Sequence, residues 1–237
     1  MPWGSLDLRD FDEHTILAAR ASWTVAAFQA YRIAVGRAIA AQGLLEAGAP
    51  VDVAALASSL PLEALTHAEL CARMAMELGG AVPLAFDRDL LYPRPDPTQP
   101  VLVRALEAIV RGFCVGETIC RPLVRVVRDL PAVPLIRAIC RRIARDDAPH
   151  AAFGWLVLDW ALPSVDRAGR AHLGRVARLA IDAHAAGARS DLARGDAVPS
   201  LLDPMAWMAT REGATMILRL LDERLVGQFA ERDVPLD

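Results

Sequence analysis

The sequence contains no lysine and no asparagine, so all 26 of its basic residues are arginine. Both missing residues have AT-rich codons, and a GC-rich genome therefore explains their absence without a functional reason. The formal net charge of -3 provides no strongly basic field. This charge argues against a nucleic-acid-binding protein, because such proteins neutralise phosphates with clustered cations.

Long apolar runs are also missing. No run reaches the roughly 18 residues that suggest a membrane span, and the acidic N-terminal stretch MPWGSLDLRDFDEH lacks a signal-peptide pattern. The cysteines lack the spacing of a zinc site and are typical of reduced core thiols. They are Cys71, Cys114, Cys120 and Cys140. We therefore expect a cytoplasmic protein with no membrane partner.

Aromatic residues are scarce, at 5% of a chain that is 54% hydrophobic. Alanine and leucine supply most of the apolar content, and this composition favours helices over strands. The length of 237 residues is sufficient for one domain with a substantial core. We expect an all-α protein that forms a single domain over residues 1–237.

Apolar periodicity, glycine stops and prolines predict where the helices begin and end. The predicted helices span about residues 12–46, 51–78, 101–129, 135–162, 165–186 and 204–229. The segment AVPLAFDRDLLYPRPDPTQP separates the second helix from the third and is too rich in proline to be a regular helix. Four long helices with one long crossover in the middle are the ferritin-like arrangement. We expect this bundle over about residues 12–162 and additional helices over 163–237.

The stretch ARDDAPHAAFGW contains Asp147 and His150, which a helix would place on one face. Pro149 lies between them, where a helix resists it. An apolar stripe nevertheless continues in steps of three and four residues on both sides of the motif. This unbroken phase predicts one continuous helix that bends near Arg145. The alternative is a new helix that is capped by Asp146 or Asp147 and has Pro149 in its first turn.

Other polar residues interrupt apolar stripes in the same way. Glu117 lies within the stripe of the third helix, in GFCVGETIC, and His67 lies within that of the second, in LTHAELCARMA. We therefore expect His67, Glu117, Asp147 and His150 to converge in the interior of the bundle. Glu69 lies off its stripe and is expected to be exposed. The remaining histidines, His14, His172 and His184, are predicted to be surface residues.

The segments THAELCARMA, CVGETIC and ARDDAPHAAFGW resemble the motifs of helices 2, 3 and 4 in ferritin-like di-iron carboxylate proteins. Those proteins use one Glu from each of two helices and a Glu-x-x-His pair from each of the other two. The resemblance implies that Glu117, Asp147 and His150 form one half of such a site, with Asp147 in place of a Glu.

The other half of the implied site is incomplete. His67 occupies the histidine position, but the two acids are replaced by Ala64 and, on the first helix, by Ala30. Glu63 is adjacent to Ala64 but points about 100° away around the helix, so we do not expect it to be a ligand. The resemblance therefore implies at most one metal ion, and the space left by the two lost acids is expected to become an apolar pocket for a substrate.

The leading expectation is an oxidoreductase that acts on a small organic molecule. Iron is the expected metal, with manganese and zinc as weaker candidates. His67, Glu117, Asp147 and His150 are the expected ligands, and Glu117 and Asp147 are the expected catalytic residues. The expected partner is the small-molecule substrate, and association of two copies of the chain remains open.

Two alternatives need no metal. One is a cofactor-free enzyme in which Asp147 or Glu117, its pKa shifted by burial, performs acid–base chemistry. The other is a non-catalytic protein that kept the fold for assembly, with its buried carboxylates neutralised by arginine. Arg121, one turn from Glu117, is the expected arginine partner in that case.

Overall fold

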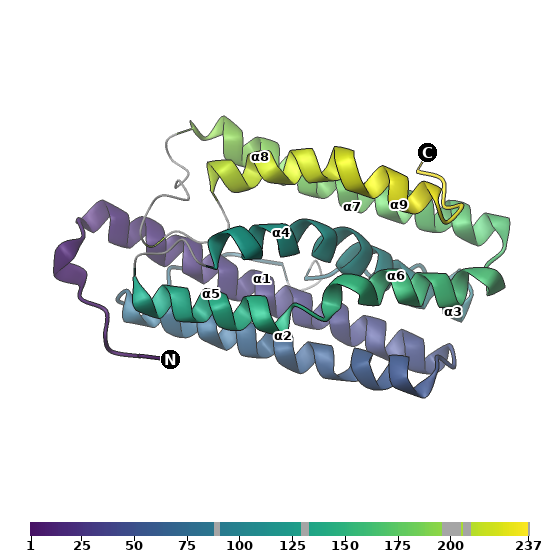
Figure 1. The fold of residues 1–237 in the computed structure, drawn as a ribbon, viewed down its shortest axis with the longest axis horizontal. Helices are drawn as coiled ribbons and strands as arrows, with labels where there is room; N and C mark the ends of the chain where they lie inside the picture. The colour runs from purple at the N-terminus through teal and green to yellow at the C-terminus, as the bar shows by residue number, and fades with distance from the viewer. Residues whose placement is uncertain (88–90, 129–132, 196–204, 206–209, 237) are drawn as a thin grey trace.

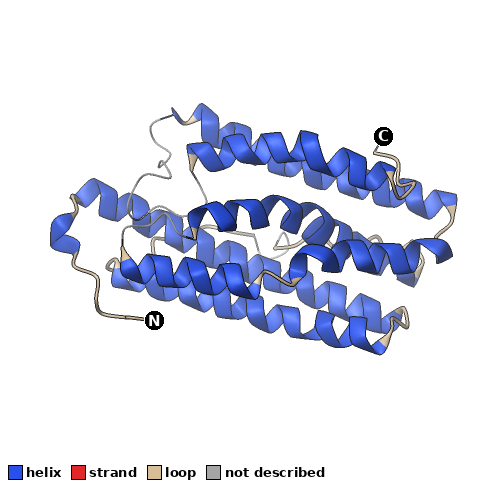
Figure 2. Ribbon diagram, viewed as in Figure 1, coloured by secondary structure: helices blue, strands red, loops and turns tan. Residues whose placement is uncertain are grey.

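The computed structural model describes residues 1–87, 91–128, 133–195, 205 and 210–236. In this part of the chain all regular structure is helical (Figure 2). The predicted all-α class is therefore confirmed. None of the helices within these ranges combines the length and the apolar character needed to cross a membrane.

The first two long helices form an antiparallel hairpin. They are α1 (Glu13–Glu46) and α2 (Val51–Glu77), and they lie side by side along most of their length (Figure 1). The Asp12 side chain accepts a hydrogen bond from the backbone N–H of Thr15 and so caps the start of α1. Both predicted helices are confirmed, and the turn between them passes through Gly48, whose φ of 70° suits glycine.

The third predicted helix contains an unpredicted change of winding. It begins as α3 (Val101–Ile109), continues as a π-helical segment (Val110–Glu117) and ends as α4 (Thr118–Val127). The last residue of the prediction, 129, lies outside the described residues. Segments of π-helix are rare and are frequently found at functional sites. Glu117 is the last residue of this one.

The fourth predicted helix is not continuous, and that prediction is wrong. The structure has two helices, α5 (Pro134–Asp146) and α6 (His150–Ala161), joined by a turn (Figure 1). Pro149 supplies no N–H to the carbonyl of Arg145, and its ring conflicts with that carbonyl in a regular helix.

Across this turn, hydrogen bonds between residues three apart replace the bonds between residues four apart that an α-helix would have. The N–H of Ala148 donates to the carbonyl of Arg145 at 3.3 Å, and the N–H of His150 donates to that of Asp147 at 3.1 Å. The alternative of a new helix beginning near Pro149 therefore describes the structure better. Neither acid caps it, because Pro149 itself occupies the N-cap position.

The C-terminal helices form an additional layer on one side of the bundle (Figure 1). They are α7 (Arg167–Ala193), α8 (Arg211–Leu220) and α9 (Val226–Ala230), with a π-helical segment (Leu221–Leu225) between the last two. The predicted helix over 165–186 is confirmed and extends further. The predicted start at 204 lies outside the described residues.

The two histidines on α7, His172 and His184, were predicted to be surface residues, and this prediction is wrong. His172 Nε2 lies 3.0 Å from the buried Glu107 Oε1, which also accepts a hydrogen bond from the N–H of Asp96. These contacts attach the crossover to α3 and α7. His184 is half-buried, and burial lowers its pKa.

The apolar core of the bundle is divided into two clusters. On α1, one cluster contains Ala19, Trp23 and Ala26, and the other contains Ala40, Ala41 and Leu44. The same division occurs on α2, where Leu60 belongs to one cluster and Cys71 to the other. The stretches between the clusters carry buried polar side chains, and these side chains form the candidate site.

Candidate metal centre

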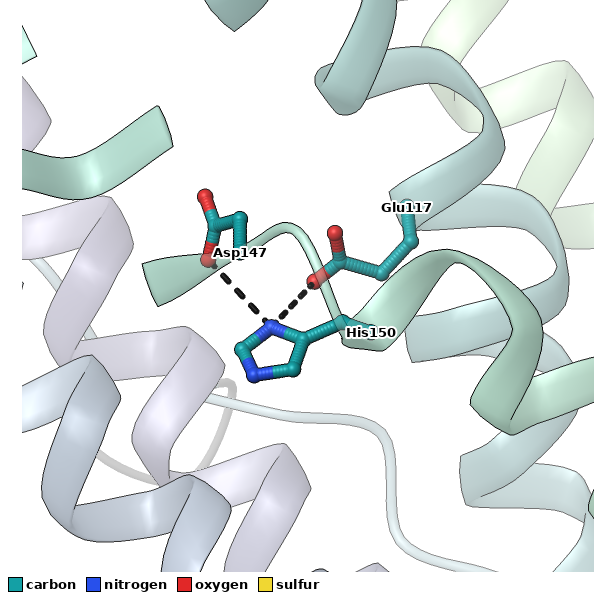
Figure 3. Close-up of side chains that lie close together, drawn as sticks. All are labelled: Glu117, Asp147 and His150. Carbon is teal, nitrogen blue, oxygen red and sulfur yellow. Dashed lines mark ion pairs between the residues drawn. The ribbon is translucent and has the colours of Figure 1, made fainter. Parts of the chain in front are cut away.

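Three potential ligands converge where α5 ends and α6 begins. Glu117, Asp147 and His150 each offer one ligand atom, and these atoms lie within 4.8 Å of one another. Figure 3 shows the two carboxylates on either side of the imidazole. His150 Nδ1 is 3.3 Å from Asp147 Oδ1 and 3.9 Å from Glu117 Oε1. The turn at Pro149 places Asp147 just before α6, and the end of the π-helical segment places Glu117 opposite.

An arginine from α1 lies among these three residues. Arg37 Nη2 is 2.7 Å from Glu117 Oε1, 3.1 Å from His150 Nδ1 and 3.7 Å from Asp147 Oδ1. Its side chain is only 5% exposed. Arg37 Nη1 donates to the Leu60 carbonyl at 3.3 Å, which fixes the guanidinium in place.

Arg37 was not among the predicted site residues, and the prediction that Arg121 would pair with Glu117 is wrong. The sequence did contain a signal for Arg37. It lies on the line of Ala34, Ala41 and Leu44, all of which are buried, in steps of three and four residues. The apolar-stripe criterion that was applied to the second, third and fourth predicted helices therefore also identifies this arginine on the first helix.

The hydrogen bonds define the tautomer of His150. A guanidinium donates hydrogen bonds and accepts none, so His150 Nδ1 accepts from Arg37. The opposite ring nitrogen, Nε2, then carries the proton and donates to Glu63 Oε2 at 2.8 Å. Glu63 is therefore a hydrogen-bond partner of a predicted ligand, although its position about 100° around the helix from Ala64 argued against a place at the site.

This arrangement leaves one buried acceptor without a donor. Asp147 Oδ1 is inaccessible to solvent and makes no hydrogen bond among the described residues. A buried carboxylate oxygen of this kind lowers stability unless a cation or a proton lies beside it. Asp147 Oδ1 is thus the atom of the cluster that a metal ion or a proton would satisfy best.

His67 extends the cluster along α2. Its Nδ1 is 3.9 Å from Asp147 Oδ1, and its Nε2 is 3.4 Å from Asp146 Oδ2. Asp146 also pairs with Arg142 at 2.6 Å. The structure therefore brings together all four predicted residues. Glu69, four residues before Arg73 on the same helix, has a side chain that is 68% exposed, as predicted.

Burial and neighbouring charges act against each other in this cluster. Burial raises the pKa of Glu117, and the positive charge of Arg37 opposes the rise. Burial also lowers the pKa of His67. For His150 burial disfavours the charge, but Asp147 can accept a hydrogen bond from the protonated ring, and this bond together with the negative charges of Asp147 and Glu117 outweighs burial and raises the pKa. Protonation of His150 would give Asp147 Oδ1 a donor, but it would break the bond from Arg37.

The donor set fits one metal ion. It contains one imidazole and two carboxylates, which suit iron, manganese or zinc. The bond between His150 and Glu63 is the carboxylate–histidine pairing that commonly orients a metal-bound imidazole. Ala64 is buried, and the α1 side chain that reaches the cluster is Arg37 rather than an acid.

No protein-family model matches the chain, and neither the curated proteins nor the solved structures include a significant match. The resemblance to ferritin-like proteins, the metal and the roles of the site residues are therefore still predictions.

Proposed function

We propose that the chain is a ferritin-like oxidoreductase that holds one redox-active metal ion and acts on a small organic substrate. The observation that carries the proposal is the convergence of Glu117, Asp147 and His150, whose ligand atoms lie within 4.8 Å of one another. The long α1–α2 hairpin and the extended crossover before α3 support the ferritin-like arrangement.

In this proposal the three residues hold the ion, and His67, whose Nδ1 lies 3.9 Å from Asp147 Oδ1, could provide a fourth contact. Iron is the preferred metal, since mixed imidazole and carboxylate ligation suits it. When bound, iron would supply one-electron transfer and activation of dioxygen. Glu63 holds the His150 ring by accepting its Nε2 proton. The substrate would lie between α1 and α2, close to Ala30 and Ala64.

A second ion is not part of the proposal. The positions that would supply its carboxylates carry Ala30 and Ala64. The positive charge of Arg37 lies beside Glu117 and would repel another cation there. We therefore expect close to one metal ion per chain and no bridged pair.

Metal content tests this proposal directly. The protein should be purified without chelators, loaded with Fe²⁺ under anaerobic conditions and assayed by elemental analysis. Glu117→Gln keeps the shape of the side chain and removes its charge, so it should abolish metal retention while the circular dichroism spectrum stays helical. Glu107→Gln is the matched control, because Glu107 is also buried but is bonded to His172 outside the cluster.

An iron content near one per parent chain, lost only in Glu117→Gln, is the expected result. No retained metal in the parent would refute the metal centre. A content near two, with the spectrum of a bridged cluster, would show that the assignment of Ala30 and Ala64 is wrong.

A second candidate function is supported by Asp147 Oδ1. This buried acceptor lies 3.3 Å from His150 Nδ1, and the two atoms could exchange a proton in a cofactor-free acid–base enzyme. Substrate turnover by metal-free protein that is lost in Asp147→Asn would support this alternative over the metal centre.

A further inference from the structure

We infer that Arg37 is a built-in competitor of the metal ion, which neutralises the cluster when no ion is bound and must withdraw when one binds. This inference rests on the proposed single-ion site. It goes further because it assigns to one residue of α1 the control of how tightly the ion is held.

The competition follows from the hydrogen bonding of His150. In its neutral form an imidazole ring has only one nitrogen with a free lone pair. The other nitrogen, Nε2, keeps its proton for Glu63 at 2.8 Å. The lone pair of Nδ1 already accepts a hydrogen bond from Arg37 Nη2 at 3.1 Å. A metal bond to Nδ1 therefore requires that this hydrogen bond break.

The same nitrogen of Arg37 also contacts the other two ligands. It donates to Glu117 Oε1 at 2.7 Å and lies 3.7 Å from Asp147 Oδ1. One Arg37 nitrogen thus contacts all three residues that would bind the ion. Bonds from a first-row metal ion to such ligands are about 2.0–2.2 Å long, so the ion and Nη2 would occupy overlapping positions.

Arg37 and a metal ion would neutralise the same two carboxylates, so each can replace the other. Without an ion, Arg37 is the closest cation to Glu117 and Asp147 among the described residues, and it neutralises part of their negative charge. An ion would take over that role and would repel the guanidinium at short range. Arg37 therefore lowers the metal affinity of the parent protein, and its removal should raise that affinity.

Neutral and charged substitutions of Arg37 test the inference. The affinity for Mn²⁺ should be measured by isothermal titration calorimetry and by the paramagnetic resonance signal of free Mn²⁺. Arg37→Met and Arg37→Gln remove the charge and should bind Mn²⁺ about tenfold more tightly or better. Arg37→Lys keeps a positive charge and should stay close to the parent.

Arg20→Met is the matched control on the same helix. Arg20 is part-buried and donates to the carbonyl of Gly80, away from the cluster. Its replacement should leave the Mn²⁺ affinity unchanged. Arg37→Gln retains a donor for Glu117, so it offers a second neutral variant if Arg37→Met does not fold.

A measurement on the parent is independent of any variant. The side-chain NMR signals of Arg37 should be protected from solvent exchange by burial. Saturating Zn²⁺ should shift these signals and remove their protection.

The outcomes separate this inference from the proposed function. Parent and neutral variants that all fail to bind Mn²⁺, with Arg37 signals unchanged by Zn²⁺, would overturn both. A parent that binds one ion while Arg37→Met and Arg37→Gln bind it equally or more weakly would overturn the competition alone and leave the metal centre standing.

Discussion

At the residue scale, Glu63 shows how a side chain outside the ligand set can control the site. Its carboxylate is 36% exposed, whereas its partner His150 is 1% exposed. The 2.8 Å bond between them orients the ring, so that Nδ1 faces Glu117 and Asp147. Glu63 thus determines which nitrogen of His150 is available to Arg37 or to a metal ion.

We predict that Glu63→Gln weakens metal binding by about 10- to 100-fold, the usual effect of removing the carboxylate partner of a metal-bound histidine. The fold should be retained, because the side chain is partly exposed and the substitution keeps its shape. Isothermal titration calorimetry with Mn²⁺ measures the effect. Glu69→Gln, an exposed change on the same helix, serves as the control. Equal affinities of Glu63→Gln and parent would mean that Glu63 does not support the ligand.

The sequence predicted the interior residues of the site better than the bonds among them. His67, Glu117, Asp147 and His150 interrupt apolar stripes, and periodicity alone places such residues inside. The stripe on the first helix also marks Arg37 as an interior residue, but the bonds that Arg37 and Glu63 form with these residues depend on which helices face each other and at what height. A helix pattern does not contain that information, because it specifies a face and not a register against the neighbouring helix.

At the scale of the elements, the contact between α6 and the π-helical segment positions His150 against Glu117. Gly154 makes this contact close. A Cβ atom at residue 154 would lie 2.5 Å from the Cβ of Phe113 and 3.0 Å from the backbone N of Cys114. Because one neighbour is backbone, it cannot move aside as a flexible side chain would.

We predict that Gly154→Ala destabilises the protein by about 1–3 kcal/mol, the usual effect of overpacking. Chemical denaturation monitored by circular dichroism measures this change. The substitution should also weaken metal binding, because α6 must move away from Glu117.

The control for this prediction is Gly187→Ala on α7, where a new Cβ would meet nothing within 4 Å. That change should instead stabilise the protein by roughly 0.5–1 kcal/mol, because alanine has the higher helix propensity. If both alanine variants were equally stable, the close packing at Gly154 would have no energetic effect.

The helix boundaries were predictable where glycine, proline or a capping residue marks them. The stops at Gly48 and Gly79 and the cap at Asp12 gave α1 and α2 nearly to the residue. The break before His150 was missed because the turn keeps the apolar phase, so Ile143 and Gly154 are both buried across it. The π-helical segment was not predicted, because an apolar stripe in steps of three and four residues indicates a helix without specifying its winding.

At the scale of the whole molecule, the site separates two apolar clusters that both include residues of α1, α2 and α4. The first includes Leu44, Leu60 and Phe113, and the second includes Trp23, Cys71 and Ile139. A layer of buried charges between them contributes less to stability than an apolar core would, because its groups lose hydration. A ligand that satisfies this layer should therefore stabilise both halves of the bundle.

We predict that Mn²⁺ raises the melting temperature of the parent protein. At 100 times its dissociation constant the ion should contribute about 2.7 kcal/mol. For a domain of this size that free energy corresponds to roughly 5–10 °C, which differential scanning calorimetry resolves easily. EDTA should reverse the shift, and Glu117→Gln should not show it. An identical shift in Glu117→Gln would place the responsible ion elsewhere on the molecule.

The separation of Arg37 and His150 along the chain has a consequence for how the protein matures. Their bond joins residues 113 positions apart, so the two ends meet only after α2, the crossover, α3, α4 and α5 have been synthesised. Contacts of such long range tend to form late, since the loop they close must first lose its conformational entropy. A nascent chain interrupted before α6 would contain Arg37 and both carboxylates, Glu117 and Asp147, but not the imidazole of His150. The proposed metal centre is thus completed only after the start of α6 has been synthesised.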